Sequence, residues 1–176
     1  MVQNEKQVAL GEAVEDFALE DIHGKTCRLS DFRGKIAVLV FWSAECEVSR
    51  EYDAYFNSLP DRYPQGQVVV LAIDSNVHYG MEEIAETIQE RGIEFPVLRD
   101  DEAIIADRFG ALTTPHVFVV DATGRLAYEG AVDDRTFRQL EATVNYLDEA
   151  LAAILMGKKP VVTQTQPYGC TIVRYH

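Results

Sequence analysis

Three cysteines, Cys27, Cys46 and Cys170, are the side chains of this 176-residue chain best suited to redox chemistry. A cysteine thiolate attacks disulfides and peroxides, and two thiols that meet can form a disulfide. The count is odd and no two cysteines are close in sequence, so at most one internal pair can form and at least one thiol stays free. Such a sparse set is not the disulfide framework of a small secreted domain, so we expect a cytoplasmic protein.

Cys46 has the position that best favours a reactive thiol. The segment from Phe41 to Arg50 is predicted to run from the end of a buried strand into the first turn of a helix. Unpaired amide groups at a helix start carry partial positive charge and favour thiolate over thiol. Glu45 and Glu47 oppose this effect if they point toward the sulfur, whereas Arg50 acts in the opposite sense. The sequence leaves this balance open.

The apolar pattern along the chain predicts the elements that position this segment. Continuous β-prone runs are typical of strands covered on both faces, and apolar residues three and four apart are typical of helices. On this basis we expect a hairpin at 16–29, strands at 36–42, 68–73, 95–98, 116–120 and 125–132, and helices at 46–60, 81–92, 103–109 and 137–157. This order predicts an α/β fold with a central mixed β-sheet flanked by helices and an N-terminal β-hairpin.

One domain and a tail account for the length of the chain. With 47% hydrophobic side chains in 176 residues, the sequence can build one sizeable core. We expect a domain at 1–157 and a C-terminal tail at 158–176. The tail holds Lys158, Lys159 and Arg174 without an acidic residue, so its charge of +3 leaves −16 for the rest of the net −13. We hypothesise that the basic tail docks on the acidic domain, with residues 171–173 along a sheet edge.

Composition and spacing also exclude several classes of ligand. A net charge of −13 argues against nucleic acid and against an anionic membrane surface, because both select clustered cations. The longest apolar run, 36–42, is far too short to span a bilayer, and residues 1–14 have no basic region followed by an apolar stretch, so we expect a mature soluble protein. The four histidines have no metal-ligand spacing, so we expect neither a metal nor any other cofactor.

Two motifs resemble the thioredoxin superfamily. A Phe-Trp-x-x-x-Cys motif ends at Cys46 on a predicted strand-to-helix junction, and a Thr-Thr-Pro motif ends at Pro115 before a later strand. The resemblance implies that Pro115 is cis and lies beside the reactive sulfur. It also implies that Trp42, Thr114 and Pro115 contact substrate, with the backbone of Thr114 left free to pair with a substrate strand.

Further segments extend the resemblance to nearly the whole chain. These are Asp16-Phe-Ala-Leu, Leu29-Ser-Asp-Phe-Arg-Gly-Lys35, Ala72-Ile-Asp-Ser-Asn76, Phe95-Pro-Val-Leu and the tail segment Pro167-Tyr-Gly-Cys-Thr-Ile172. Together they are similar to the AhpC/TSA-type redoxins, and within these to a thioredoxin-like branch whose tail carries Gly-Cys-x-Ile. The resemblance implies a thioredoxin-like fold and a redox activity, either thiol–disulfide exchange or antioxidant chemistry, in cell redox homeostasis.

The chain departs from this family around Cys46. Thioredoxins have a second cysteine three residues later, and this branch often has one three residues earlier, but these positions hold Ser49 and Ser43 here. The motif is therefore a degenerate Cys-x-x-Ser. A peroxiredoxin needs Pro-x-x-x-Thr-x-x-Cys, and Leu39 and Ser43 stand in place of its proline and threonine.

A second sulfur is needed to complete a dithiol cycle, because a single thiolate can only form a mixed disulfide. Cys170, Cys27 or an external thiol could supply it, and the stretch from Gly157 to Cys170 could extend roughly 40 Å. We interpret the chain as a thiol–disulfide oxidoreductase with Cys46 as nucleophile, Ser49 stabilising the thiolate and Cys170 as candidate resolving thiol. Its partners would be protein or small-molecule disulfides and an external thiol reductant.

Two other functions stay open at this point. In a peroxiredoxin-like thiol peroxidase, peroxide would oxidise Cys46 to a sulfenic acid, and Ser43 or Arg50 would orient the oxidant. Alternatively, loss of the second motif cysteine would leave a degenerate, non-catalytic redoxin that acts as a binding module.

Overall fold

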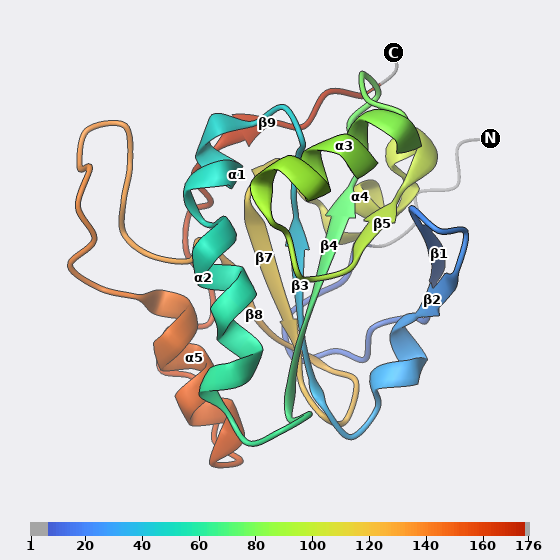
Figure 1. Cartoon of the computed structure of the whole chain (residues 1–176). Helices are drawn as coiled ribbons and strands as arrows, with labels where there is room; N and C mark the ends of the chain where they lie inside the picture. Colours follow the sequence, from blue (N-terminus) through green and yellow to red (C-terminus); the bar gives the residue numbers. More distant parts are fainter. Residues whose placement is uncertain (1–6, 175–176) are drawn as a thin grey trace.

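The computed structural model describes residues 7–174, which fold around one central β-sheet (Figure 1). The ends of the expected domain and tail, residues 1–6 and 175–176, lie outside the described residues. In chain order the strands, α-helices and short 3₁₀ helices (η) are β1 (Ala18–Asp21), β2 (Thr26–Arg28), η1 (Leu29–Phe32), β3 (Ile36–Phe41), α1 (Glu47–Glu51), α2 (Asp53–Ser58), η2 (Leu59–Arg62), β4 (Val68–Asp74), α3 (Met81–Arg91), β5 (Val97–Arg99), η3 (Asp101–Ala103), α4 (Ile104–Phe109), β6 (Thr113–Thr114), β7 (His116–Val120), β8 (Leu126–Gly130), α5 (Tyr146–Leu155) and β9 (Cys170–Thr171).

The main sheet is mixed, as the sequence predicts. Its seven strands lie in the order β2-β1-β5-β4-β3-β7-β8. β3, β4 and β5 are parallel, whereas β1 and β2 on one side and β7 and β8 on the other are antiparallel to their neighbours. All six residues of β3 are buried, which explains why its sequence is apolar without alternation.

Helices cover both faces of this sheet. On one face, α2, α3 and α5 pack Phe56, Ile84 and Leu147 against side chains of β3 and β4. On the other face, α4 packs Ile105 and Phe109 in a second core. The predicted α/β fold, a mixed sheet flanked by helices with an N-terminal hairpin, is therefore confirmed.

The helix predicted after Cys46 is present but divided. α1 and α2 meet at Tyr52, where φ is −101° and ψ is 0°. The predicted apolar face is retained across this break, because Val48, Tyr52 and Phe56 are all buried. The division therefore changes the course of the chain without exposing the side chains that cover the sheet.

The helix predicted from residue 137 is wrong in its first part, because α5 begins only at Tyr146. The preceding residues form a loop that projects from the body (Figure 1, orange). Phe137 and Leu140 on this loop are 73% and 78% exposed. Their spacing imitates a buried helix face, but neither side chain reaches the core.

Side-chain hydrogen bonds explain where the loop ends and α5 begins. The Asp134 carboxylate accepts hydrogen bonds from the backbone N–H groups of Thr143 and Val144, at 2.8 and 3.2 Å. Asn145 then caps α5, because its side-chain oxygen accepts the Asp148 N–H at 2.8 Å. These polar side chains compete with a continuous helix and fix its start.

The tail returns along the sheet and contacts three parts of the domain. Backbone hydrogen bonds join Thr163 and Thr165 to Glu129 of β8. β9 then pairs antiparallel with β6 and lies beside α1 (Figure 1). Further on, Arg174 forms an ion pair with Asp107, with Nε and Oδ1 2.8 Å apart. The basic tail therefore docks on the acidic domain, as hypothesised.

Candidate redox site

Cys46 lies where β3 gives way to α1. The chain leaves β3 at Phe41, turns through residues 42–45 and enters α1 with Cys46 as the N-cap residue. The Ser49 N–H donates to Cys46 Sγ at 3.4 Å, so the sulfur occupies the place of a capping oxygen. Cys46 is only 3% exposed. The sulfur is thus at the helix start that the sequence predicts.

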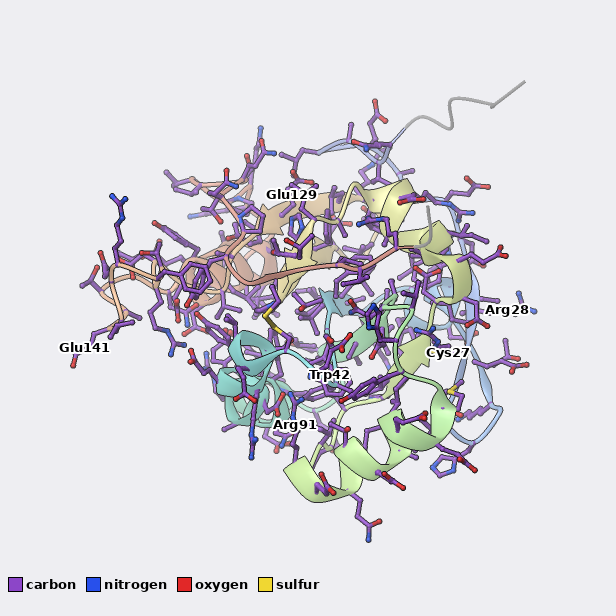
Figure 2. The ribbon with its side chains drawn as sticks, turned by 90° about the horizontal axis from the view of Figure 1, so that it is seen from above. Cys27, Arg28, Trp42, Arg91, Glu129 and Glu141 are labelled. Carbon is purple, nitrogen blue, oxygen red and sulfur yellow. A yellow bond between two sulfur atoms is a disulfide. The ribbon has the colours of Figure 1, made fainter. Side chains whose placement is uncertain are left out.

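Cys46 is bonded to the tail residue Cys170. The two form a disulfide with their Cα atoms 6.1 Å apart, although 124 residues separate them in sequence. Figure 2 shows this bond well apart from Cys27, which is the free cysteine of the described residues. The hypothesis that the docked tail brings Cys170 to Cys46 is confirmed.

Cys27 has the features of an unreactive thiol. It is half-buried on β2, opposite Leu19 of β1. Burial, and next the nearby Asp31 carboxylate, raise the pKa of the Cys27 thiol. A raised pKa leaves less thiolate, which is the nucleophilic form.

The strand beside the sulfur is β6, which immediately precedes Pro115. The Thr114–Pro115 peptide bond is cis, as the resemblance implies. Thr114 O lies 3.3 Å from Cys46 Sγ. β6 pairs with β9 so that Thr114 is opposite Cys170. The edge expected to meet a substrate strand is therefore occupied by the protein's own tail.

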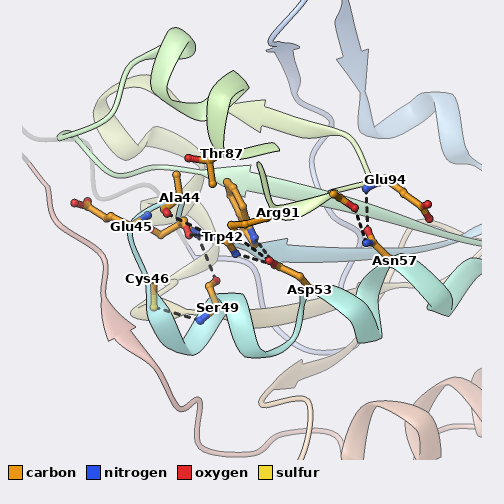
Figure 3. Close-up of polar contacts among 12 residues, drawn as sticks. Trp42, Ala44, Glu45, Cys46, Ser49, Asp53, Asn57, Thr87, Arg91 and Glu94 are labelled. Atoms are coloured by element: carbon orange, nitrogen blue, oxygen red, sulfur yellow. Dashed lines mark hydrogen bonds and ion pairs between the residues drawn. The ribbon is translucent and has the colours of Figure 1, made fainter. Parts of the chain in front are cut away.

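A buried ion pair supports the turn between β3 and α1 (Figure 3). Arg91 at the end of α3 binds Asp53 of α2 through Nε–Oδ2 and Nη2–Oδ1 hydrogen bonds of 2.6 and 2.8 Å. Its guanidinium carbon lies 4.7 Å from the ring centroid of Trp42, and Trp42 Nε1 donates to Asp53 Oδ1 at 3.1 Å. Arg91 Nη1 also donates to the carbonyls of Ser43 and Ala44, at 3.4 and 3.2 Å. Arg91 therefore connects the turn to α2 and α3.

A buried carboxyl group, that of Asp74, lies at the end of β4. Asp74 Oδ1 accepts the backbone N–H of Asn76 at 3.0 Å, whereas Asp74 Oδ2 has no hydrogen-bond partner among the described residues. Burial raises the pKa of Asp74 to about 6, against the opposing effects of the Asn76 hydrogen bond and of Arg99.

The other predicted site residues lie in varied surroundings. The Ser49 hydroxyl oxygen accepts the Ser43 N–H at 3.4 Å. The group of Ser49 that donates a hydrogen bond to Cys46 Sγ is therefore its backbone N–H. Ser43 is buried, and its hydroxyl oxygen accepts the Glu45 N–H at 3.2 Å. Trp42 is fully buried beneath the turn, whereas Arg50 is exposed on α1.

The charged groups that support the turn were not found from the sequence. Arg91 and Asp53 are 38 residues apart, and nothing in their local patterns indicates that they meet. The buried carboxyl group of Asp74, which is not hydrogen-bonded to the turn itself, had a weak signal, because it ends a run of buried apolar residues. By contrast, the acidic neighbours of the sulfur, Glu45 and Glu47, are exposed, so water screens their charges.

Residues 7–174 lack two kinds of feature. No cluster of three or more His, Cys, Asp or Glu side chains in this range could hold a metal ion. In the same range, none of the helices combines the length and the apolar character needed to cross a bilayer.

Comparison with known proteins agrees with this geometry. The sequence profile of the AhpC/TSA family matches residues 10–129. The chain is 31% identical over 120 residues to the thiol-disulfide oxidoreductase ResA of Geobacillus thermodenitrificans (strain NG80-2), an alignment that covers 68% of this chain and 67% of the relative.

Solved structures extend the likeness to the whole fold. A hypothetical protein from Sinorhizobium meliloti 1021 superposes with a TM-score of 0.82 at 26% identity, and the match covers 97% of both chains. A thiol:disulfide interchange protein, DsbE, from Chlorobium tepidum superposes with a TM-score of 0.64 at 23% identity over 70% of this chain and 85% of its own. The second likeness concerns the fold alone.

Proposed function

The chain belongs to the AhpC/TSA family, and from this premise we propose that it is a thiol–disulfide oxidoreductase whose redox pair is Cys46 and Cys170. The observation that carries the proposal is the disulfide between the helix-start cysteine and the docked tail. The likeness to a thiol-disulfide oxidoreductase over two thirds of the chain supports it. Ser49 occupies the position of the usual second motif cysteine, and Cys170 supplies the missing sulfur from the tail.

The reaction follows from the chemistry of such a pair. The Cys46 thiolate attacks one sulfur of a substrate disulfide, so that a Cys46–substrate bond forms and the second substrate sulfur leaves as a thiolate that takes up a proton. The Cys170 thiolate then attacks Cys46 Sγ and releases the first substrate sulfur in the same way. The substrate gains two electrons and two protons, and the protein pair becomes a disulfide.

The cycle closes when an external dithiol reduces the Cys46–Cys170 bond. We propose protein or small-molecule disulfides as substrates and a thiol reductant as electron donor. We also propose that the protein works in the cytoplasm, a compartment that suits its few cysteines. Cell fractionation, with the redox state of the pair trapped by alkylation, tests the location.

The test of the activity is reduction of insulin disulfides with dithiothreitol as electron donor. We expect activity in the full chain and its loss in Cys46→Ser. Cys170→Ser should slow turnover and accumulate a mixed disulfide at Cys46, because dithiothreitol from solution must then replace the resolving sulfur. Cys27→Ser is the matched control and should retain activity.

The same variants separate the other candidate functions. A thiol peroxidase would consume peroxide with a thiol donor and fail to reduce insulin, and Cys46 would pass through a sulfenic acid. A binding module would leave Cys46 unreactive toward both substrates after reduction. Either outcome would replace the proposed oxidoreductase activity.

A further inference from the structure

One backbone edge lies beside the reactive sulfur, and the tail occupies it. β6 presents this edge, with Thr114 O 3.3 Å from Cys46 Sγ and Thr114 opposite Cys170 in the β6–β9 pair. A disulfide brings the Cα atoms of its two cysteines to within about 4.4–6.8 Å of each other. Any segment whose cysteine is bonded to Cys46 therefore has its backbone close to β6.

The position before the bonded cysteine has no room for a side chain. A Cβ atom built on Gly169 would collide with the carbonyl of Thr114, only 2.6 Å from its carbon, and would lie 3.1 Å from Pro115 N. These obstacles are backbone atoms, which cannot rotate away as a flexible side chain can. A strand seated in this register must therefore carry glycine at that position.

Apolar contacts lie on either side of this Gly-Cys pair. Ile172, two residues after Cys170, is 3% exposed and belongs to the core that includes α4. Its N–H donates to Leu112 O at 3.1 Å, so the backbone pairing continues there. On the other side, the ring of Tyr168 packs edge-on against Phe137, with centroids 4.7 Å apart. The tail thus fits the site through one apolar side chain at each end.

We propose that the substrate of this site is an extended polypeptide segment that takes the place of the tail, with glycine immediately before its disulfide cysteine and an aliphatic residue two positions after it. This inference rests on the proposed function and adds the substrate class. Main-chain pairing with β6 supplies affinity, while the missing Cβ and the aliphatic side chain supply selectivity. The tail and the substrate strand exclude each other at β6.

The structure also contains the means for the tail to leave and return. The Thr165 hydroxyl contacts the Tyr128 hydroxyl at 2.7 Å and accepts the Ala131 N–H at 2.9 Å, and both contacts lie upstream of Cys170. β9 can therefore leave β6 while the tail remains attached at β8. A tail held this close returns to β6 at high effective concentration, attacks Cys46 Sγ and displaces the reduced strand.

Matched glycine-to-alanine changes in a peptide and in the protein test this inference, in the full chain carrying Cys27→Ser and Cys170→Ser so that Cys46 is the one cysteine left. The probe is a peptide with the sequence of residues 166–173, its cysteine joined to thionitrobenzoate, a coloured thiolate when released. Cys46 attack on the peptide sulfur releases it, and its absorbance gives the rate. Replacing the peptide glycine by alanine should slow the reaction about tenfold or more, because the added methyl group overpacks the strand site. Replacing the peptide isoleucine by serine should also slow it.

The same glycine-to-alanine change in the protein should have the opposite effect. Gly169→Ala prevents the protein's own tail from seating on β6, so the unmodified peptide should react faster, by about tenfold. Equal rates for the glycine and alanine peptides, together with no effect of Gly169→Ala, would overturn the inference and leave the proposed function standing, since thionitrobenzoate release itself reports an active Cys46. Failure of Cys46 to react even with the symmetrical nitrobenzoate disulfide would overturn the proposed function and the inference with it.

Discussion

Arg91 and Asp53 form a bidentate ion pair, and their side chains are only 8% and 9% exposed. Asp53→Asn would leave the guanidinium charge buried without its counter-ion. We expect this substitution to lower the free energy of unfolding by about 3–5 kcal/mol. Urea unfolding measures this free energy. The fluorescence of Trp42, the only tryptophan, reports the transition, and its indole N–H is hydrogen-bonded to Asp53 itself.

A second Arg–Asp pair on the surface provides the matched control. The side chains of Arg62 and Asp148 are 40% and 34% exposed. Water already solvates both charges, so Arg62→Gln should cost less than about 1 kcal/mol. Equal losses in the two variants would contradict the argument that burial sets the contribution of the Arg91–Asp53 pair.

Gly130 lies where the tail pairs with β8, at Thr165. A Cβ atom at this residue would approach the backbone O and N of Thr165 to 2.5 and 2.8 Å. Gly130→Ala should therefore push the tail away from β8 and lower the effective concentration of Cys170 at Cys46, by about tenfold. The fraction of Cys46–Cys170 disulfide across glutathione buffers, read by alkylation and mass spectrometry, gives this ratio.

Gly24→Ala is the control for this change. Gly24 has a positive φ of +75° like many turn glycines, but no atom lies within 4 Å of the added Cβ, and the residue is in the β1–β2 turn. Its substitution should strain the turn without changing the disulfide fraction. The same loss of disulfide in both variants would mean that general destabilisation, and not the tail attachment, is being measured.

Asp74 and His116 should give opposite pH dependences of stability. Burial raises the pKa of Asp74 from 3.8 to about 6, so the folded state keeps a proton that the unfolded state has lost, and stability falls as pH rises through this range. Burial lowers the pKa of His116 from 6.5 to about 4, so the unfolded state takes up a proton first, and stability falls as pH decreases from 6.5 to 4. In the unchanged protein the two effects offset each other.

Asp74→Asn removes one of these effects and exposes the other. In this variant the free energy of unfolding should fall by about 3 kcal/mol between pH 6.5 and pH 4, because Asp74 no longer offsets the His116 contribution. Urea unfolding at a series of pH values measures the slope. Parallel profiles for the variant and the unchanged protein would refute the assignment to Asp74.

Ser49 offers a way to separate a hydroxyl from a backbone amide. Ser49→Ala keeps the N–H that donates to Cys46 Sγ and removes the oxygen that accepts the Ser43 N–H. We expect the free energy of unfolding to fall by about 1 kcal/mol. In the Cys170→Ser background, the rate of Cys46 alkylation by iodoacetamide should change by less than about twofold, since the thiolate keeps its amide donor. A fall of about tenfold or more would assign the stabilisation to the hydroxyl instead.

The parts of the molecule that could be predicted are those with local signals. The buried strand ending at Phe41, the helix start at Cys46 and the turn before Pro115 each depend on a few consecutive residues. The pairing with Cys170 was accessible for a different reason, because three cysteines allow few partners and the tail could reach. These signals together make Cys46 the expected nucleophile and Cys170 one of its candidate partners.

The parts that could not be predicted depend on contacts between distant residues. The loop before α5 exists because Asp134 binds the backbone of Thr143 and Val144, and periodicity alone gave Phe137 and Leu140 a buried face that they do not have. The support of the turn by charged groups was invisible for the same reason. A pattern of residue types reports which side chains prefer burial, but not which polar groups meet across the sheet.

The disulfide has a thermodynamic consequence for the whole chain. It joins residues 124 positions apart, so most of the oxidised protein is a covalent ring even when unfolded. Closing a ring of this size removes chain entropy from the unfolded state and favours folding by about 5 kcal/mol. Reducing the disulfide returns that entropy to the unfolded state. An electron donor of this protein therefore also lowers its free energy of unfolding.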